Sequence, residues 1–172
     1  MPKIRIQKRI EAPIERCFDL ARSIDFHVLS MSASGEEVVG GVTKGLIGLG
    51  QEVTWSGRHF GRRQRLTARI TKFSRPHRFQ DCMVEGAFKQ FTHDHHFRTD
   101  GHATIMEDVF AFESPFGILG HLANVLFLSR YMTRMLTARA QRLKLAAESD
   151  EWRKYLKADD ESPPGTHETN DG

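Results

Sequence analysis

The sequence predicts an α+β protein in which a curved antiparallel sheet of about seven strands wraps around a long C-terminal helix. Three observations predict this fold class. One strand-like segment is followed by two short helical patterns. Six segments with alternating apolar and polar residues then follow, separated by turn residues. The last pattern has the 3.6-residue period of an amphipathic helix.

The N-terminal elements are a strand and two short helices. Isoleucines alternate with polar residues from Ile4 to Ile10, which indicates a strand. Because proline is well accommodated in the first turn of a helix, Pro13 predicts a helix over residues 13–22. Residues 23–33 predict a second short helix or a turn.

The middle of the chain reads as a meander of six strands. We expect them at residues 36–42, 51–60, 63–73, 79–88, 91–98 and 102–113. Glycines at positions 41, 45, 48 and 50 suit a loop with unusual backbone dihedrals, and their spacing matches no phosphate-binding loop. Thr99-Asp100-Gly101 fits a hairpin connection.

A long helix is predicted over residues 118–147. Its apolar stripe consists of Ile118, Leu122, Val125, Leu126, Met132, Leu136, Ala140 and Leu143. The same period places four basic residues outward: Arg134, Arg139, Arg142 and Lys144. The first half is apolar nearly all round, and we expect it to roof a cavity. A homodimer contact or a touch on a membrane surface stays open for this half.

The composition is typical of a globular domain, with 39% hydrophobic and 27% charged residues. We expect one domain over residues 1–147, followed by an acidic helix extension and a disordered tail over residues 148–172. The sequence contains no signal-peptide pattern and no apolar stretch long enough to span a bilayer, so we expect a cytoplasmic protein. Cys17 and Cys82 are far apart and are expected to be free thiols.

The first half of the chain is basic. Residues 1–80 hold 15 Lys and Arg against 7 Asp and Glu. Four arginines fall largely on the polar face of one predicted strand: Arg62, Arg63, Arg65 and Arg69. The interleaved aromatic residues of single-strand binders are missing, so no nucleic-acid binding is expected. An interaction module whose partner meets this basic face stays open.

The segment from Phe79 to Phe112 places ionisable and large apolar residues on the same strand faces. A buried polar group costs several kcal/mol unless it is paired, so these positions predict a pocket wall rather than a filled core. The polar members of this wall are Asp81, Glu85, His93, His95 and Asp108.

Three interpretations of this polar set are open. Same-face residues on neighbouring strands lie about 5 Å apart, so a histidine–carboxylate cluster is expected. We favour a polar network that lines a cavity. An acid–base site would use the candidate catalytic residues His93, His95, Asp108 and Asp81. Two histidines and a carboxylate also suit zinc or iron, but we expect no metal and no cofactor.

The order of elements resembles the helix-grip fold of the SRPBCC superfamily, which includes START lipid-transfer domains and aromatic polyketide cyclases. The segments APIERCFDLA and PFGILG and the glycine-rich stretch carry this likeness. An uncharacterised bacterial group of the superfamily is similar in a pattern formed here by Phe79, Asp81, Met83, Gly86, Phe88, His93, His95, Phe97, Met106 and Asp108. The resemblance covers about residues 2–147 and carries over no catalytic set.

We expect a carrier or sensor that holds a small apolar or amphipathic ligand between the sheet and the long helix. The predicted ligand-binding residues are Trp55, His59, Asp81, Met83, Glu85, His93, His95, Phe97, Met106, Asp108, Phe110, Phe112, Leu122 and Leu126. The alternative is an enzyme that resembles the cyclase and dehydratase branch, with the His–Asp cluster as general base. Whether the protein is an enzyme stays open.

Overall fold

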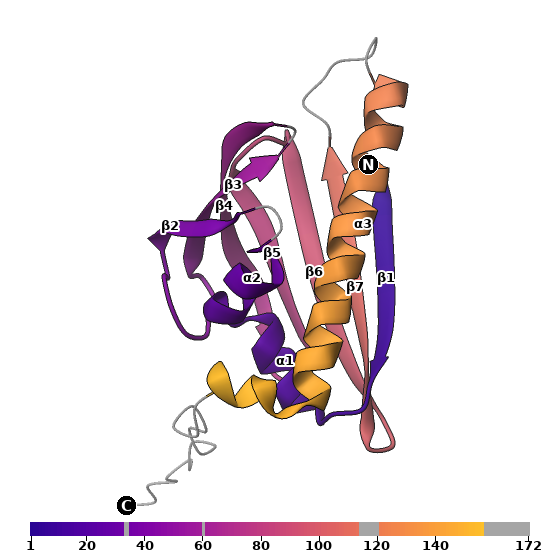
Figure 1. Ribbon diagram of the computed structural model, residues 1–172. Coiled ribbons are helices and arrows are strands. Elements are labelled where there is room, and N and C mark those ends of the chain that lie inside the picture. Colours follow the sequence, from indigo (N-terminus) through magenta and orange to yellow (C-terminus); the bar gives the residue numbers. More distant parts are fainter. Residues whose placement is uncertain (33–34, 60, 114–120, 157–172) are drawn as a thin grey trace, which may run out of the picture.

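A seven-stranded antiparallel sheet and one long helix form most of the computed structural model, which describes residues 1–32, 35–59, 61–113 and 121–156 (Figure 1). The elements in chain order are β1 (Lys3–Ile10), α1 (Ile14–Ala21), α2 (Ile24–Ser30), β2 (Glu37–Gly41), β3 (Glu52–His59), β4 (Arg62–Ser74), β5 (Arg78–Glu85), β6 (Gln90–Asp100), β7 (Ala103–Glu113), α3 (His121–Glu148) and the 3-10 helix η3 (Asp150–Lys154). The predicted start of the last helix at residue 118 and most of the predicted tail lie outside the described residues.

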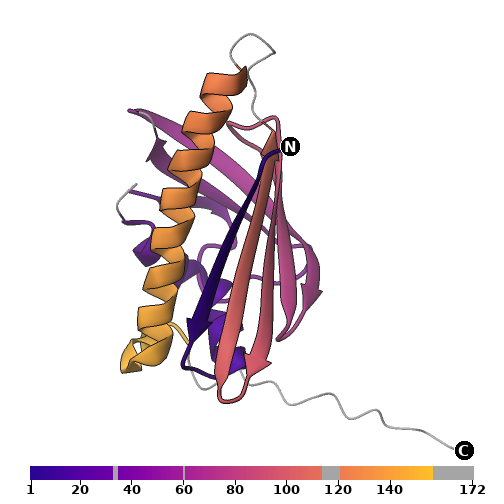
Figure 2. The same ribbon diagram turned by 90° about the vertical axis from the view of Figure 1, so that its right-hand side faces the viewer.

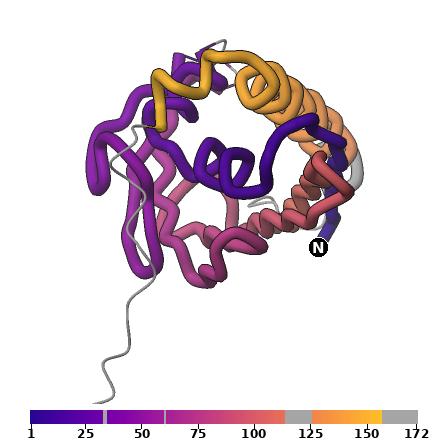
Figure 3. The backbone as a smooth tube through the Cα atoms, turned by 90° about the horizontal axis from the view of Figure 1, so that it is seen from below, coloured from indigo at the N-terminus to yellow at the C-terminus, as the bar shows by residue number. Residues whose placement is uncertain are grey.

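The strand order in the sheet is β1-β7-β6-β5-β4-β3-β2. The six strands from β2 to β7 form the predicted meander, and the first strand joins its far edge by pairing with β7. The sheet curves strongly, so that in an end-on view the chain forms a ring with α3 opposite the middle strands (Figure 3). The predicted α+β fold class is therefore confirmed.

Helix α3 lies against β1 and α1 along the concave side of the sheet (Figures 1 and 2). Its buried face repeats every three or four residues, through Met132, Leu136, Ala140 and Leu143. No helix in the described part of the chain is long and apolar enough to cross a membrane.

For two residues of α3, the side chain faces the opposite way from the prediction. Leu126 is 65% exposed, because six residues turn a helix by about 600° and leave Leu126 about 120° away from Met132. Arg139 was expected to point outward but is only 7% exposed. It follows Met132 by seven residues, which is two helical turns, and therefore lies on the buried face. The outward placement of Arg139 was wrong.

Helices α1 and α2 close one end of the space between the sheet and α3 (Figure 1). The ring of Phe18 in α1 is fully buried and contacts the rings of Phe73, Phe79 and Phe97 edge-on, at centroid distances of 5.4 to 5.5 Å. Such edge-to-face contacts add to the stabilisation from apolar burial. This end of the sheet is therefore filled by side chains.

The strand register brings the polar residues of β5, β6 and β7 together. Asp81 pairs with His93 across β5 and β6, and Asp108 pairs with His95 across β6 and β7. Because side chains alternate along a strand, His93 and His95 share the inner face, while Asp94 lies on the outer face. There Asp94 accepts two hydrogen bonds from Arg78, at 2.9 and 2.6 Å.

Candidate functional site

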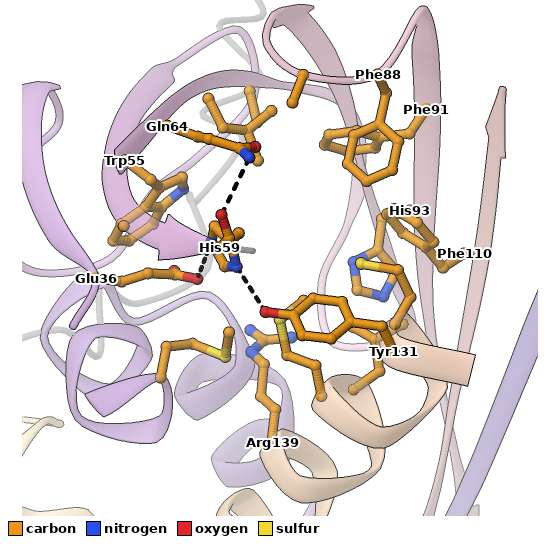
Figure 4. A pocket seen from close by; sticks show the side chains of 18 of the residues that line it. Glu36, Trp55, His59, Gln64, Phe88, Phe91, His93, Phe110, Tyr131 and Arg139 are labelled. Atoms are coloured by element: carbon orange, nitrogen blue, oxygen red, sulfur yellow. Dashed lines mark hydrogen bonds and ion pairs between the residues drawn. The ribbon is translucent and has the colours of Figure 1, made fainter. Parts of the chain in front are cut away.

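A cavity of about 280 Å³, called the main cavity below, lies between the inner face of the sheet and α3 (Figure 4). Its apolar wall contains Trp55, Leu66, Ala68, Phe88, Phe91, Phe110, Leu128, Met132, Met135 and Leu136. Its polar lining contains His27, Glu36, His59, Gln64, Arg65, Asp81, His93, Tyr131 and Arg139. Two polar groups contribute to this lining: one on β5–β7, of which Asp81 and His93 reach the main cavity, and one around Glu36 that joins β3 to α3.

His95 is the centre of the first polar group. Its Nδ1 lies 2.7 Å from Oδ1 of Asp108, and its Nε2 lies 3.1 Å from Oδ1 of Asp81. Burial lowers the pKa of His95, but the two carboxylates outweigh burial and raise this pKa above its ordinary value. Burial raises the pKa of Asp108, but His95 outweighs burial and holds this pKa far below its ordinary value. Both ring nitrogens of His95 therefore face a carboxylate oxygen at hydrogen-bond distance, and this arrangement favours the imidazolium, which donates to both.

His93 lies over the His95 ring, at a centroid distance of 3.9 Å, and forms no comparable hydrogen bonds within the part of the chain that the structure describes. Its Nδ1 is 4.0 Å from Asp81 and its Nε2 is 3.9 Å from Asp108. Burial, and next the positive charge of His95, lower the pKa of His93 to about 3. The neutral ring lines the main cavity, and its Nε2 has no hydrogen-bond partner among the described residues.

Arg139 brings a second buried cation to the same region. Its Nη2 donates to the backbone carbonyl of Ala21, at 2.9 Å, which fixes the guanidinium at the end of α1. Its positive charge helps to lower the pKa values of Asp81 and Asp108. Arg139 and His93 also line a smaller neighbouring cavity of about 80 Å³.

The second polar group is centred on Glu36, which directly precedes β2. Its carboxylate lies 3.0 Å from Nε2 of His27 and 3.5 Å from Nε2 of His59. Burial raises the pKa of Glu36, but these two histidines outweigh burial and lower the pKa to about 2. Nδ1 of His59 lies 2.8 Å from the hydroxyl oxygen of Tyr131, so this group connects the sheet to α3 (Figure 4). A Cβ at Gly57 would lie 2.7 Å from Cγ of Glu36, so glycine makes room for the carboxylate.

The structure brings together part of the predicted ligand-binding set. The predicted residues that line the main cavity are Trp55, His59, Asp81, His93 and Phe110. His95 lines the smaller cavity, and Asp108 is buried behind His95.

The other predicted residues do not line either cavity. They are Met83, Glu85, Phe97, Met106, Phe112 and Leu126, while the side chain of Leu122 lies outside the described residues. Phe97, Met106 and Phe112 are almost fully buried in the core, whereas Glu85 is exposed near the end of β5. The strand residues among them share faces with the cavity residues but lie at other positions along the strands, whereas Leu126 lies on the exposed side of α3.

Several lining residues were missed in the sequence, including His27, Glu36, Tyr131 and Arg139. The helical period could have found Arg139, since it recurs with the apolar residues of α3. Glu36 gave no such signal, because its inward position depends on the contacts with His27 and His59.

Asp81, His93 and His95 could also offer one metal-ligand atom each, and these atoms lie within 4.8 Å of one another. Zinc ligands lie about 2.0–2.2 Å from the ion, so two ligands of one tetrahedral ion are about 3.4 Å apart. The 4.0 Å between Asp81 and His93 exceeds this separation. A metal ion would also replace the His95–Asp81 hydrogen bond. The arrangement therefore fits a hydrogen-bonded network of histidines and carboxylates better than a metal site.

The fold recurs in solved structures of other proteins. TTHA0849 from Thermus thermophilus matches with a TM-score of 0.70 and 21% identity, over 86% of this chain and 100% of that one. Ginseng major latex-like protein 151 from Panax ginseng matches with a TM-score of 0.62 and 15% identity, over 86% and 98%. CV1439 from Chromobacterium violaceum matches with a TM-score of 0.65 and 10% identity, over 86% and 98%.

No protein-family model and no curated protein sequence matches the chain. With identities of 21% or less in these three structures, the likeness establishes the architecture. The chain has the helix-grip fold that the SRPBCC resemblance implied.

Proposed function

We propose that this protein binds a small amphipathic molecule in the main cavity, as a carrier or a sensor. Small-molecule sites are mostly apolar concavities with a few placed polar groups. The observation that carries the proposal is the combination of an aromatic and methionine wall with the polar group around His93. The wall supplies apolar area, and the polar group orients one end of the ligand.

The size of the main cavity favours a compact ligand. Pockets for drug-sized molecules measure about 300–1,000 Å³. The main cavity, at about 280 Å³, lies just below this range. A molecule of one or two fused rings suits this volume, and aromatic side chains such as Phe88, Phe91 and Phe110 favour contact with rings.

An acid–base enzyme of the cyclase type has weaker support. A general base works best when its pKa lies near the working pH. Both ring nitrogens of His95 already bind carboxylates, and the pKa of His93 is about 3. The cluster is therefore better suited to orienting a ligand than to abstracting a proton.

The proposal predicts that filling the main cavity blocks binding. Met135→Trp adds bulk from α3 into the cavity and should weaken the binding of 2-naphthol, a neutral fused-ring probe, by at least about tenfold. Ala138→Trp is the matched control, because Ala138 is exposed on the same helix. Titration of 2-naphthol, followed by its own fluorescence, measures both affinities.

Thermal unfolding of both variants checks that they fold. Saturable binding to the wild type that Met135→Trp leaves unchanged would contradict the proposed site. If neither 2-naphthol nor a wider panel of fused-ring compounds binds the wild type, the proposed function is wrong.

A further inference from the structure

Two buried nitrogen atoms, in residues that line the main cavity, have no hydrogen-bond partner among the described residues. They are Nε2 of His93 and Nε of Arg139. Each residue is only 7% exposed, and each lines the main cavity. Leaving such a buried polar atom without a partner is unfavourable, and more so for a charged group. A ligand atom that accepts hydrogen bonds would remove this cost.

The charge of Arg139 makes an anion the best acceptor. Among the described residues, the guanidinium has one hydrogen bond, to the backbone carbonyl of Ala21, and no ion pair. The nearby carboxylates of Asp81 and Asp108 are already bound to His95. Hydrogen bonds between a guanidinium and a carboxylate are strong and can form in pairs.

The surroundings of Arg139 indicate what the rest of such a ligand is. Its side chain rises from α3 beside Tyr131, while Phe88 and Phe91 lie at the opposite, upper side of the view and Phe110 lies beside His93 (Figure 4). A ring in contact with these aromatic side chains could therefore direct an acidic substituent toward Arg139 and His93.

We infer that the ligand is a compact aromatic carboxylate, held by the Arg139 guanidinium with His93 as a second hydrogen-bond partner. This inference rests on the proposed function and names the ligand class of the same site. The aromatic wall sets the shape of the ligand, and Arg139 sets its charge.

Two probes that share one ring system test the inference. 2-Naphthoate is ionised at pH 7, and 2-naphthamide replaces its carboxylate with a neutral amide. Isothermal titration of the wild-type protein should give at least about tenfold tighter binding of 2-naphthoate. Arg139→Gln should reduce this preference to less than about threefold. Arg134→Gln, at an exposed position of α3, should keep it.

The wild-type comparison decides the inference even if Arg139→Gln does not fold. Equal affinities for the two probes, or tighter binding of the amide, would overturn the anionic ligand class and leave the proposed function standing. Binding of neither probe, together with failure of 2-naphthol to bind, would overturn both. A preference for 2-naphthoate that a folded Arg139→Gln variant keeps would overturn the role of Arg139.

Discussion

Asp108→Asn is expected to lower the free energy of unfolding by about 3 kcal/mol, the largest effect of a single substitution in this protein that we predict. Asp108 is only 2% exposed and accepts the 2.7 Å hydrogen bond from Nδ1 of His95. Removing one partner of a buried ion pair typically costs about 3–5 kcal/mol. We expect the lower end of this range, because His95 keeps its second carboxylate partner, Asp81. Urea unfolding at pH 7, followed by circular dichroism, measures the loss.

Glu107→Gln provides the matched control for Asp108→Asn. Glu107 precedes Asp108 in β7 but lies on the outer face, where it accepts a hydrogen bond from the exposed Arg5. Surface ion pairs contribute about 0–1 kcal/mol, so the control should change little. Similar losses in the two variants would show that the His95–Asp108 pair has no special importance for stability.

The second large effect is a loss of stability between pH 6.5 and pH 5. The pKa of His93 falls from its ordinary 6.5 to about 3 in the folded protein. Below pH 6.5 the unfolded chain therefore takes up a proton that the folded protein does not, which favours unfolding. At pH 5 this difference amounts to about 2 kcal/mol for one histidine. His27, whose pKa burial also lowers, acts in the same direction.

The other members of the cluster do not cancel this loss. The raised pKa of His95 gives stability that is lost as the pH rises through that pKa and is fully present below pH 6.5. The lowered pKa values of Asp81 and Asp108 give stability that is lost only below about pH 4. Between pH 6.5 and pH 5 the lowered pKa values of His93 and His27 therefore dominate.

His93→Gln should make the free energy of unfolding less sensitive to pH. Over this range, the number of protons taken up on unfolding should fall by about one. Urea unfolding at pH 5, 6 and 7 measures the slope for the wild type and the variant. His102→Gln, at a side chain that is 90% exposed, should keep the wild-type slope. An unchanged slope in His93→Gln would mean that His93 is not held neutral in the folded protein.

The order of elements could be predicted from the sequence because each element has its own period. Alternation identified the strands, and a 3.6-residue period identified α3. The two-residue alternation of a strand also placed His93 and His95 on one face, since they are two residues apart in β6. These predictions depend on local geometry alone.

The exact extent of the cavity could not be predicted. The alternation along a strand shows which face of the sheet a residue lies on. It does not show how far that residue is from the end of the sheet where α1 packs. Phe97 is two residues from His95 on the same face, but it packs against Phe18 of α1. Similarly, the burial of Arg139 on the inner face of α3 was not predicted, because a charged residue is normally expected to face solvent.

Methionine methyl groups allow the most direct test that a ligand enters the main cavity. Of the six methionines, Met31, Met132 and Met135 line the cavity, whereas Met106 is buried elsewhere and Met1 is exposed. Titration of 2-naphthol into protein labelled with [methyl-¹³C]methionine should shift the signals of the three lining methionines saturably and leave Met1 unchanged. Absence of any saturable shift, or shifts confined to Met1, would contradict a ligand-binding cavity.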